Sequence, residues 1–188
     1  IVGLGLIGGS LGLDLQKLGY TVHGIVHREE TAKKARERKL AQTISTDPNT
    51  LKNCSIIFIA LPLEELLNPK LLLIDAIPKH SVVTDVGSVK VPVLETWKKL
   101  HPRFVASHPM TGTEEFGVNA GKYNLFKDKP WVVTPDRETD SSALEIIHQI
   151  ALLLGCNWII SEAKIHDQAV SLISHLPVFI SAALIKTL

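Results

Sequence analysis

Glycines open the chain with a spacing that suits a phosphate group. Gly3, Gly5 and Gly8 form a GxGxxG pattern that follows the apolar pair Ile1-Val2 and precedes an amphipathic helical pattern. In this context the first glycine permits a tight turn, the second lets the backbone approach a pyrophosphate, and the third lets the helix pack on the strand. The helix N-terminus then attracts the phosphate charge. The pattern predicts a dinucleotide site; a structural turn with chance glycines is the alternative.

The end of the second expected strand indicates which dinucleotide binds. Sites for NAD usually carry an acidic residue about 20 residues after the glycines, but here that position falls on or near Val26, followed by His27 and Arg28. Arginine suits the additional 2′-phosphate of NADP because it can bind phosphate through two hydrogen bonds. We therefore expect NADP. The alternative is NAD, with Arg28 solvated and Glu29 or Glu30 on the ribose.

His108 is the candidate acid–base residue. It follows the expected strand 104–107, at the carboxyl edge where open α/β sheets bind ligands. An imidazole poised near neutral pH can remove a hydroxyl proton while hydride leaves the same carbon. Ser88 lies in the loop after the neighbouring strand, where we expect it to orient His108. The predicted dinucleotide contacts are Gly3, Gly5, Leu6, Ile7, Gly8, His27, Arg28, Leu61, Pro62 and Ser88.

A third group of polar residues interrupts an apolar helical stretch. Asp167, Ser171 and His175 follow one another at intervals of four and therefore share one helix face. Buried polar groups need partners. A binding face for a polar substrate and a hydrogen-bonded network between helices both satisfy that need.

Alternating strands and helices must position these residues. The pattern predicts an α/β fold, a Rossmann-type doubly wound and mostly parallel sheet. An apolar helix then begins an all-α second domain, and Pro177 should kink it. We expect domains 1–162 and 163–188, with both ends interior to a longer protein. The expected strands are 1–2, 20–26, 55–60, 81–86, 104–107, 131–134 and 158–161, and the helices 30–39, 63–77, 93–100 and 141–154.

Composition excludes several classes of protein. With 20 basic and 19 acidic residues the net charge is +1, which gives no general attraction to nucleic acid or membrane. Apolar runs are too short to span a bilayer. Cys54 and Cys156 lack the spacing of a metal site, and we expect no metal. We expect a cytoplasmic protein, with a removed leader left open because Ile1-Val2 already reads as the interior of a strand.

Four motifs resemble the prephenate/arogenate dehydrogenase family. They are GLGLIGGS at 3–10, DVGSVK at 85–90, SHPMTGTEEFG at 107–117 and HDQAVSLISHLP at 166–177, in the family's order and spacing. The second pair is far more specific than the glycine pattern. The resemblance implies oxidative decarboxylation of prephenate or arogenate, in tyrosine biosynthesis.

The resemblance also implies roles for residues. His108 takes the proton of the ring hydroxyl, hydride passes to the nicotinamide, and carbon dioxide leaves as the ring becomes aromatic. Ser88 holds the hydroxyl and His108 in register. The implied substrate contacts are Ser88, His108, Thr113, Glu114, Asp167 and His175.

Two departures from the family pattern affect these expectations. Some members that use prephenate carry a second histidine after SHLP, where this chain has Val178. With Val26 and Arg28, this resembles the NADP-dependent arogenate enzymes, so we expect arogenate with NADP and keep prephenate with NAD as the alternative. The remaining helical domain, which in the family supplies a substrate-binding arginine and the dimer interface, is missing. We expect a homodimer through that domain and little activity without it.

Two other functions stay open at this point. β-Hydroxyacid dehydrogenases share the fold and use a lysine with an asparagine four residues later, which Lys164 and Gln168 nearly match. Their serine-glycine-glycine loop is replaced here by the residues around His108. A non-catalytic NADP-binding sensor is the other alternative, and it predicts that loss of His108 leaves function intact.

Overall fold

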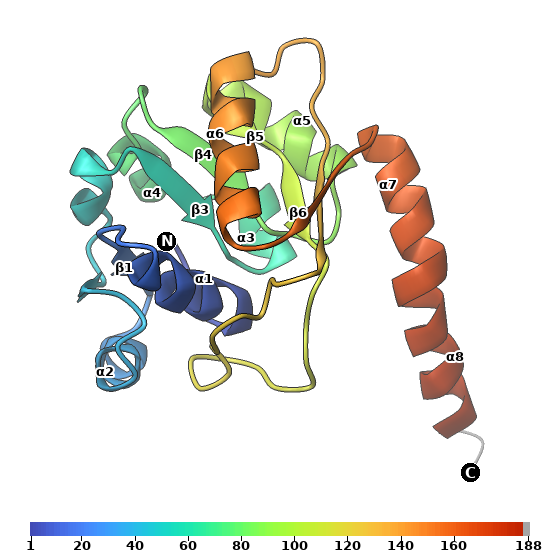
Figure 1. Cartoon of the computed structure of the whole chain (residues 1–188), viewed down its shortest axis with the longest axis horizontal. Helices are drawn as coiled ribbons and strands as arrows, with labels where there is room; N and C mark the ends of the chain where they lie inside the picture. Colours follow the sequence, from blue (N-terminus) through green and yellow to red (C-terminus); the bar gives the residue numbers. More distant parts are fainter. Residues whose placement is uncertain (186–188) are drawn as a thin grey trace.

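A parallel sheet forms the centre of the computed structural model, which describes residues 1–185 (Figure 1). Val2 bridges both Ile25 and Ile59 and so joins the two halves of this sheet. Its order is β2-β1-Val2-β3-β4-β5, and every pairing is parallel. These strands are β1 (His23–Ile25), β2 (Thr43–Ser45), β3 (Ile56–Ile59), β4 (Val82–Asp85) and β5 (Phe104–Val105).

A second set of strands continues from the first at Ala106. β6 (Ser107–Pro109) pairs antiparallel with β7 (Pro130–Val133), which runs parallel to β8 (Asn157–Ile160). The chain changes partners at Ala106, whose carbonyl accepts a hydrogen bond from Thr134. The predicted strand 104–107 is therefore wrong in its extent, since it divides at Ala106 and His108 lies within β6. The predicted mostly parallel, Rossmann-type sheet is confirmed.

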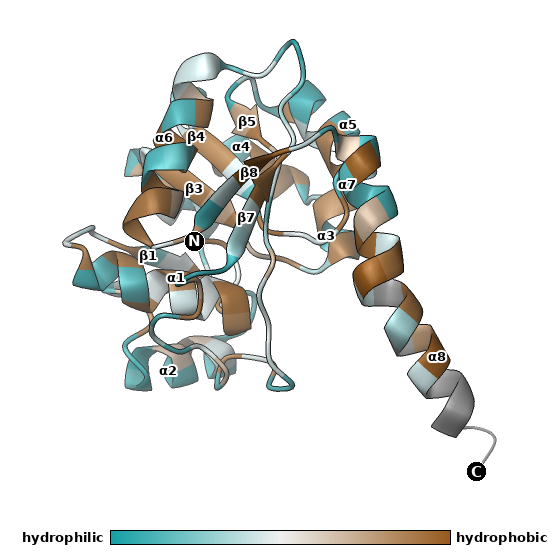
Figure 2. Cartoon of the chain, turned by 45° about the vertical axis from the view of Figure 1, so that its right-hand side comes forward, coloured by the Kyte–Doolittle hydropathy of each residue, from teal (hydrophilic) through white to brown (hydrophobic). Residues whose placement is uncertain are grey.

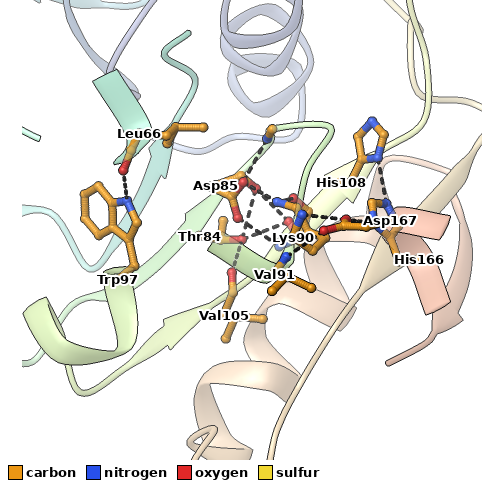
Figure 3. Close-up of polar contacts among 12 residues, drawn as sticks. Leu66, Thr84, Asp85, Lys90, Val91, Trp97, Val105, His108, His166 and Asp167 are labelled. Carbon is orange, nitrogen blue, oxygen red and sulfur yellow. Dashed lines mark hydrogen bonds and ion pairs between the residues drawn. The ribbon is translucent and has the colours of Figure 1, made fainter. Parts of the chain in front are cut away.

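Helices cover both faces of the sheet, as expected for a doubly wound fold. On one face Phe126 and Trp131 pack with α1, α2 and α6; on the other, Trp97 stacks on Phe104 with ring centroids 5.5 Å apart. The indole of Trp97 also donates to the Leu66 carbonyl at 2.9 Å (Figure 3). The covering helices are α1 (Leu6–Lys17), α2 (Glu29–Glu37), η1 (Pro48–Asn53), α3 (Leu63–Leu67), α4 (Leu71–Ala76), α5 (Val91–Leu100) and α6 (Ser141–Leu153).

The predicted single helix 63–77 is wrong. The structure has two short helices, α3 and α4, separated at Asn68 and Pro69. Proline has no N–H to donate and disfavours helical conformation in the residue before it. Asn68 accordingly has φ −126° and ψ 61°, which ends α3. The strand β2 and the 3-10 helix η1 were not predicted.

A long helical segment leaves the sheet after β8 (Figure 1). It comprises α7 (Ala163–Val170), the π-helical turn η2 (Ser171–His175) and α8 (Leu176–Ile185). The π turn immediately precedes Pro177, which cannot donate to the preceding turn. Apolar side chains on this segment are exposed, among them Ile173 at 64% and Phe179 at 72%. Figure 2 shows brown, hydrophobic stretches on α8, whereas α7 carries teal as well as brown. None of the helices within residues 1–185 has the length and apolarity needed to cross a bilayer.

Candidate active site

The glycine turn has the geometry that its sequence predicted. Gly3 has φ +89°, and a Cβ there would lie 2.3 Å from the Ala60 carbonyl oxygen. A Cβ on Gly8 would lie 1.9 Å from the Gly3 carbonyl oxygen, so α1 could not start this close to the strand with any other residue. A Cβ on Gly5 would meet no atom within 4 Å. The first and third glycines thus allow close packing, while the second leaves open space in front of the N-terminus of α1.

That space belongs to a cleft of about 740 Å³, within the size range of cofactor sites. Polar groups in it include Thr31 and Thr46, near the end of β1, which the sequence reasoning missed. Leu6, Arg28 and Ser88 are not among its lining residues. The predicted dinucleotide contacts that line it are Gly3, Gly5, Ile7, Gly8, His27, Leu61 and Pro62. The cleft therefore fits a dinucleotide with its pyrophosphate at Gly5 and the start of α1.

The end of β1 carries no carboxylate that points to the cleft. Val26 is buried, His27 lines the cleft, and Arg28 is the exposed N-cap residue of α2. Glu29, one of the two acidic alternatives, accepts a hydrogen bond from Arg36 at 2.6 Å. Both partners are largely exposed, so this pair is weak, but it engages the Glu29 carboxylate on the surface of α2.

A long loop between β6 and β7 forms part of the cleft wall through Gly117 and Val118. Arg38 fixes this loop by donating to the Val118 carbonyl at 2.9 Å and the Gly121 carbonyl at 2.7 Å. The buried carboxylate of Asp14 on α1 accepts from the Asn124 amide at 3.0 Å. The loop is thereby attached to α1, which begins at the glycine turn, and to the end of α2, which follows β1.

A buried ion pair lies at the carboxyl end of β4 (Figure 3). The ammonium of Lys90 contacts the Asp85 carboxylate and donates to the Ser107 carbonyl at 2.7 Å, and both charged side chains are fully buried. The Asp85 carboxylate also accepts from the amides of Gly87 at 2.8 Å and Ser107 at 3.1 Å. Burial raises the pKa of Asp85 and lowers the pKa of Lys90, while the attraction between the charges opposes both shifts. The pair fixes β6, and with it His108, against the end of β4.

His108 itself contacts a second histidine. Its Nδ1 lies 3.0 Å from Nε2 of His166, and the two rings are nearly perpendicular at 81°. Nδ1 of His166 lies 2.8 Å from Oδ1 of Asp167. Asp167 in turn accepts from the backbone amides of Lys90 at 2.7 Å and Val91 at 2.9 Å, at the start of α5. Figure 3 shows this chain of contacts, which joins α7 to β6 and α5.

The histidine pair is connected to the cleft through the end of β4. Val86, which lines the cleft, directly follows Asp85, and Asp85 accepts from the amide of Ser107, the residue before His108. His108 does not itself line the cleft. A dinucleotide lying along the cleft from the glycine turn would end on this side of the sheet, at the carboxyl ends of the parallel strands.

Comparison with known proteins identifies the chain. Sequence models of two domains match it: the nucleotide-binding domain of prephenate dehydrogenase over residues 11–160, and the dimerization domain of prephenate dehydrogenase over residues 162–188. The chain belongs to the prephenate dehydrogenase family. His108 lies in the first matched segment, whereas His166 and Asp167 lie in the second.

Individual family members are similar over nearly the whole chain. A cyclohexadienyl dehydrogenase of Zymomonas mobilis is 31% identical, and the alignment covers 98% of this chain and 65% of that protein. Arogenate dehydrogenase of Synechocystis is 37% identical, with a TM-score of 0.88 over 99% of this chain and 67% of that one. Prephenate dehydrogenase of Aquifex aeolicus, in complex with hydroxyphenyl propionate and NAD+, is 28% identical. Its TM-score is 0.92 over 100% of this chain and 67% of that one. The chain thus spans about two thirds of these relatives.

The other residues that the family resemblance implies lie in the loop between β4 and α5, in the long loop between β6 and β7, and on the helical segment that begins with α7. Ser88 is exposed in the loop between β4 and α5, and the hydrogen bond described above joins His108 to His166. Thr113 is half-buried and Glu114 exposed in the long loop. Asp167 binds the start of α5, and Ser171, on the same helical segment, is exposed. The side chain of His175 lies outside the described part of the structure.

Two residues at this site had no predicted role. His166 belongs to the HDQAVSLISHLP motif without a predicted role, although a carboxylate hydrogen-bonded to Nδ1 is a common way to orient an imidazole. Lys90 was likewise only the last residue of DVGSVK. A lysine between two valines, five residues after an aspartate at the end of a strand, could have signalled a buried ion pair.

Proposed function

We propose that the protein containing this chain catalyses NADP-dependent oxidative decarboxylation of arogenate to tyrosine. The observation that carries this proposal is His108, held by His166 beside the end of a cleft with a dinucleotide-binding glycine turn. The similarity to arogenate dehydrogenase of Synechocystis, at 37% identity, supports the choice of substrate. Exposed Arg28 beside the cleft, and the absence of a carboxylate at Val26, support the choice of NADP.

The residues of the chain account for the movement of the proton. When bound, NADP supplies the hydride acceptor. His108 removes the proton from the ring hydroxyl as the hydroxyl-bearing carbon gives up its hydride. The bond from the ring to its carboxylate then breaks, its electron pair enters the ring, and carbon dioxide leaves. His108 returns the proton to the resulting phenolate oxygen, which gives tyrosine and restores the neutral imidazole.

A second candidate is the NAD-dependent reaction of prephenate to 4-hydroxyphenylpyruvate. The similarity to an Aquifex aeolicus prephenate dehydrogenase bound to NAD+ favours it. Prephenate and arogenate carry the same ring and differ only in the side chain, so His108 has the same task in both. We also propose a homodimer through the helical domain, because residues 162–188 match a dimerization domain and the α7–α8 segment exposes apolar side chains.

The decisive experiment assays a full-length version of the protein with both substrates and both cofactors, following the reduced nicotinamide by absorbance. We expect the highest kcat/KM for arogenate with NADP. A clear preference for prephenate with NAD would overturn both choices, and no turnover in any combination would overturn the dehydrogenase proposal.

Arg28 offers a separate test of the cofactor choice. In Arg28→Ala we expect the KM for NADP to rise roughly 10- to 100-fold, the value of a lost charged hydrogen bond, with the KM for NAD little changed. The matched control is Lys33→Ala, which removes an exposed cation from α2. If Arg28→Ala changes the KM of both cofactors equally, Arg28 does not bind the 2′-phosphate.

A further inference from the structure

The contacts of His166 define which atoms carry protons. The carboxylate of Asp167 already accepts two backbone N–H groups, from Lys90 and Val91. A carboxylate that accepts amide bonds on both oxygens is ionised, and it can only accept from His166 Nδ1. In a neutral His166 the proton is then on Nδ1 and the lone pair on Nε2. Nε2 lies 3.0 Å from Nδ1 of His108, so His108 must donate from Nδ1.

The consequence for His108 is a single tautomer. With its proton held on Nδ1, neutral His108 carries its lone pair on Nε2, the nitrogen at the other end of the ring. A general base needs such a lone pair to take a hydroxyl proton. We propose that His166 is a positioning residue that fixes the tautomer and orientation of His108, and that Asp167 in turn fixes His166. This inference rests on the proposed function, because it assigns His166 a part in the reaction of His108.

Burial and charge around the pair favour this arrangement. Only 2% of the His166 side chain is exposed, so its ring nitrogens are partnered by His108 and Asp167 inside the protein. Partial burial alone would raise the pKa of Asp167, but the hydrogen bonds from Val91, His166 and Lys90 lower the pKa overall. Asp167 therefore stays ionised over the working pH range. Among the described residues, Lys90 also interacts electrostatically with Asp167, but its ammonium binds the Asp85 carboxylate.

The arrangement also depends on the junction between the two family segments. Asp167 lies on α7 but caps the start of α5, so one carboxylate holds the helical segment on the dinucleotide-binding domain and orients His166. A structural role in joining the domains is the competing explanation. It predicts that loss of His166 lowers stability without altering the protonation of His108.

Two replacements of His166 separate these explanations in the full-length enzyme. His166→Phe fills the volume but offers no acceptor, whereas the side-chain oxygen of His166→Gln can reach the position of Nε2. For His166→Phe we expect kcat to fall roughly 10- to 100-fold with NADP affinity unchanged. The acidic limb of the kcat/KM profile should also move to lower pH by roughly 0.5 to 1 unit, because an acceptor on Nδ1 stabilises the protonated His108. His166→Gln should recover most of the rate and the original limb.

Lys164→Ala, an exposed change on α7, is the matched control and should change none of these quantities. If His166→Phe lowers the melting temperature but leaves kcat and the pH profile as they were, the residue is structural and the inference is overturned. The proposed function has a different failure: the unmodified enzyme would turn over neither substrate.

A measurement on the unmodified protein guards against variants that do not fold. In protein labelled with ¹⁵N-histidine, long-range ¹H–¹⁵N correlation spectra report which ring nitrogen carries the proton. In spectra recorded at pH 8 we expect Nδ1 to carry the proton in both His108 and His166. A proton on Nε2 of His108 would overturn the inference.

Discussion

Replacing His108 with asparagine is expected to lower kcat by roughly 10²- to 10⁴-fold, the usual contribution of a general base. Asparagine retains a donor near the position of Nδ1, so the contact with His166 Nε2 can persist while the basic nitrogen is lost. NADP affinity should change little, since His108 does not line the cleft. The measurements are steady-state kinetics on the full-length enzyme and NADP titration by fluorescence.

His148→Asn is the control for this change. His148 is partly exposed on α6, 3.5 Å from Glu145, and its described contacts involve none of the residues of the proposed site. It should leave kcat and NADP affinity as they are. An unaltered kcat in His108→Asn would remove His108 from the mechanism and would favour the sensor alternative.

The dinucleotide half of the site could be predicted because its constraints are local. Gly3, Gly5 and Gly8 lie within six residues of one another. The first and third meet steric conditions of the strand–turn–helix, and the second leaves open space in front of the helix. The same holds for the buried strand β3, whose continuous apolar run has few other interpretations. Local patterns of this kind determine structure without reference to distant residues.

The predicted ends of helices and strands were wrong where the sequence carried competing signals or too short a signal. The helical periodicity of 63–77 outweighed Pro69 in the prediction, but the missing N–H divides the helix in the structure. The run 104–107 gave no sign that Ala106 marks a change of strand partners, because that change depends on Thr134, the residue that follows β7. β2 was missed because three residues, Thr43–Ser45, are too few for a recognisable alternation.

The partner of His108 could not be predicted, because 58 residues separate it from His166. Spacing along one helix places Asp167, Ser171 and His175 on one face, but it does not reveal which of them meets another element. Only the docking of α7 on α5 shows that Asp167 binds backbone amides and turns His166 toward β6. The proposed site thus draws on both family segments, and the sequence described each segment separately.

Docking of α7 relies on the start of α5, and Lys90 is the fully buried residue at that start. Its ammonium is the one cation that the described contacts place against the Asp85 carboxylate. The other described partners of this carboxylate are the backbone amides of Gly87 and Ser107. We expect Lys90→Met to lower the free energy of unfolding by about 3–5 kcal/mol, because it leaves a buried carboxylate without its counter-charge. Urea unfolding of the full-length protein, followed by circular dichroism, measures this change.

The loss of unfolding free energy in Lys90→Met should depend on pH in a defined direction. Burial already raises the pKa of Asp85, and removing Lys90 raises that pKa further. A carboxyl whose pKa is higher in the folded than in the unfolded state favours folding below its unfolded pKa and loses that contribution as pH rises through the folded value. The difference between Lys90→Met and the unmodified protein should therefore be smaller at pH 5 than at pH 8.

Lys98→Met is the matched control for the loss of Lys90. Lys98 lies on the same helix and pairs with Asp136 and Glu138, but it is exposed to solvent, so its replacement should change stability little at either pH. Equal stability of Lys90→Met and the unmodified protein would show that the Asp85 carboxyl is neutral in the fold. The contact with Lys90 would then be an ordinary hydrogen bond, and α5 would owe its starting position to the two amides that bind Asp167.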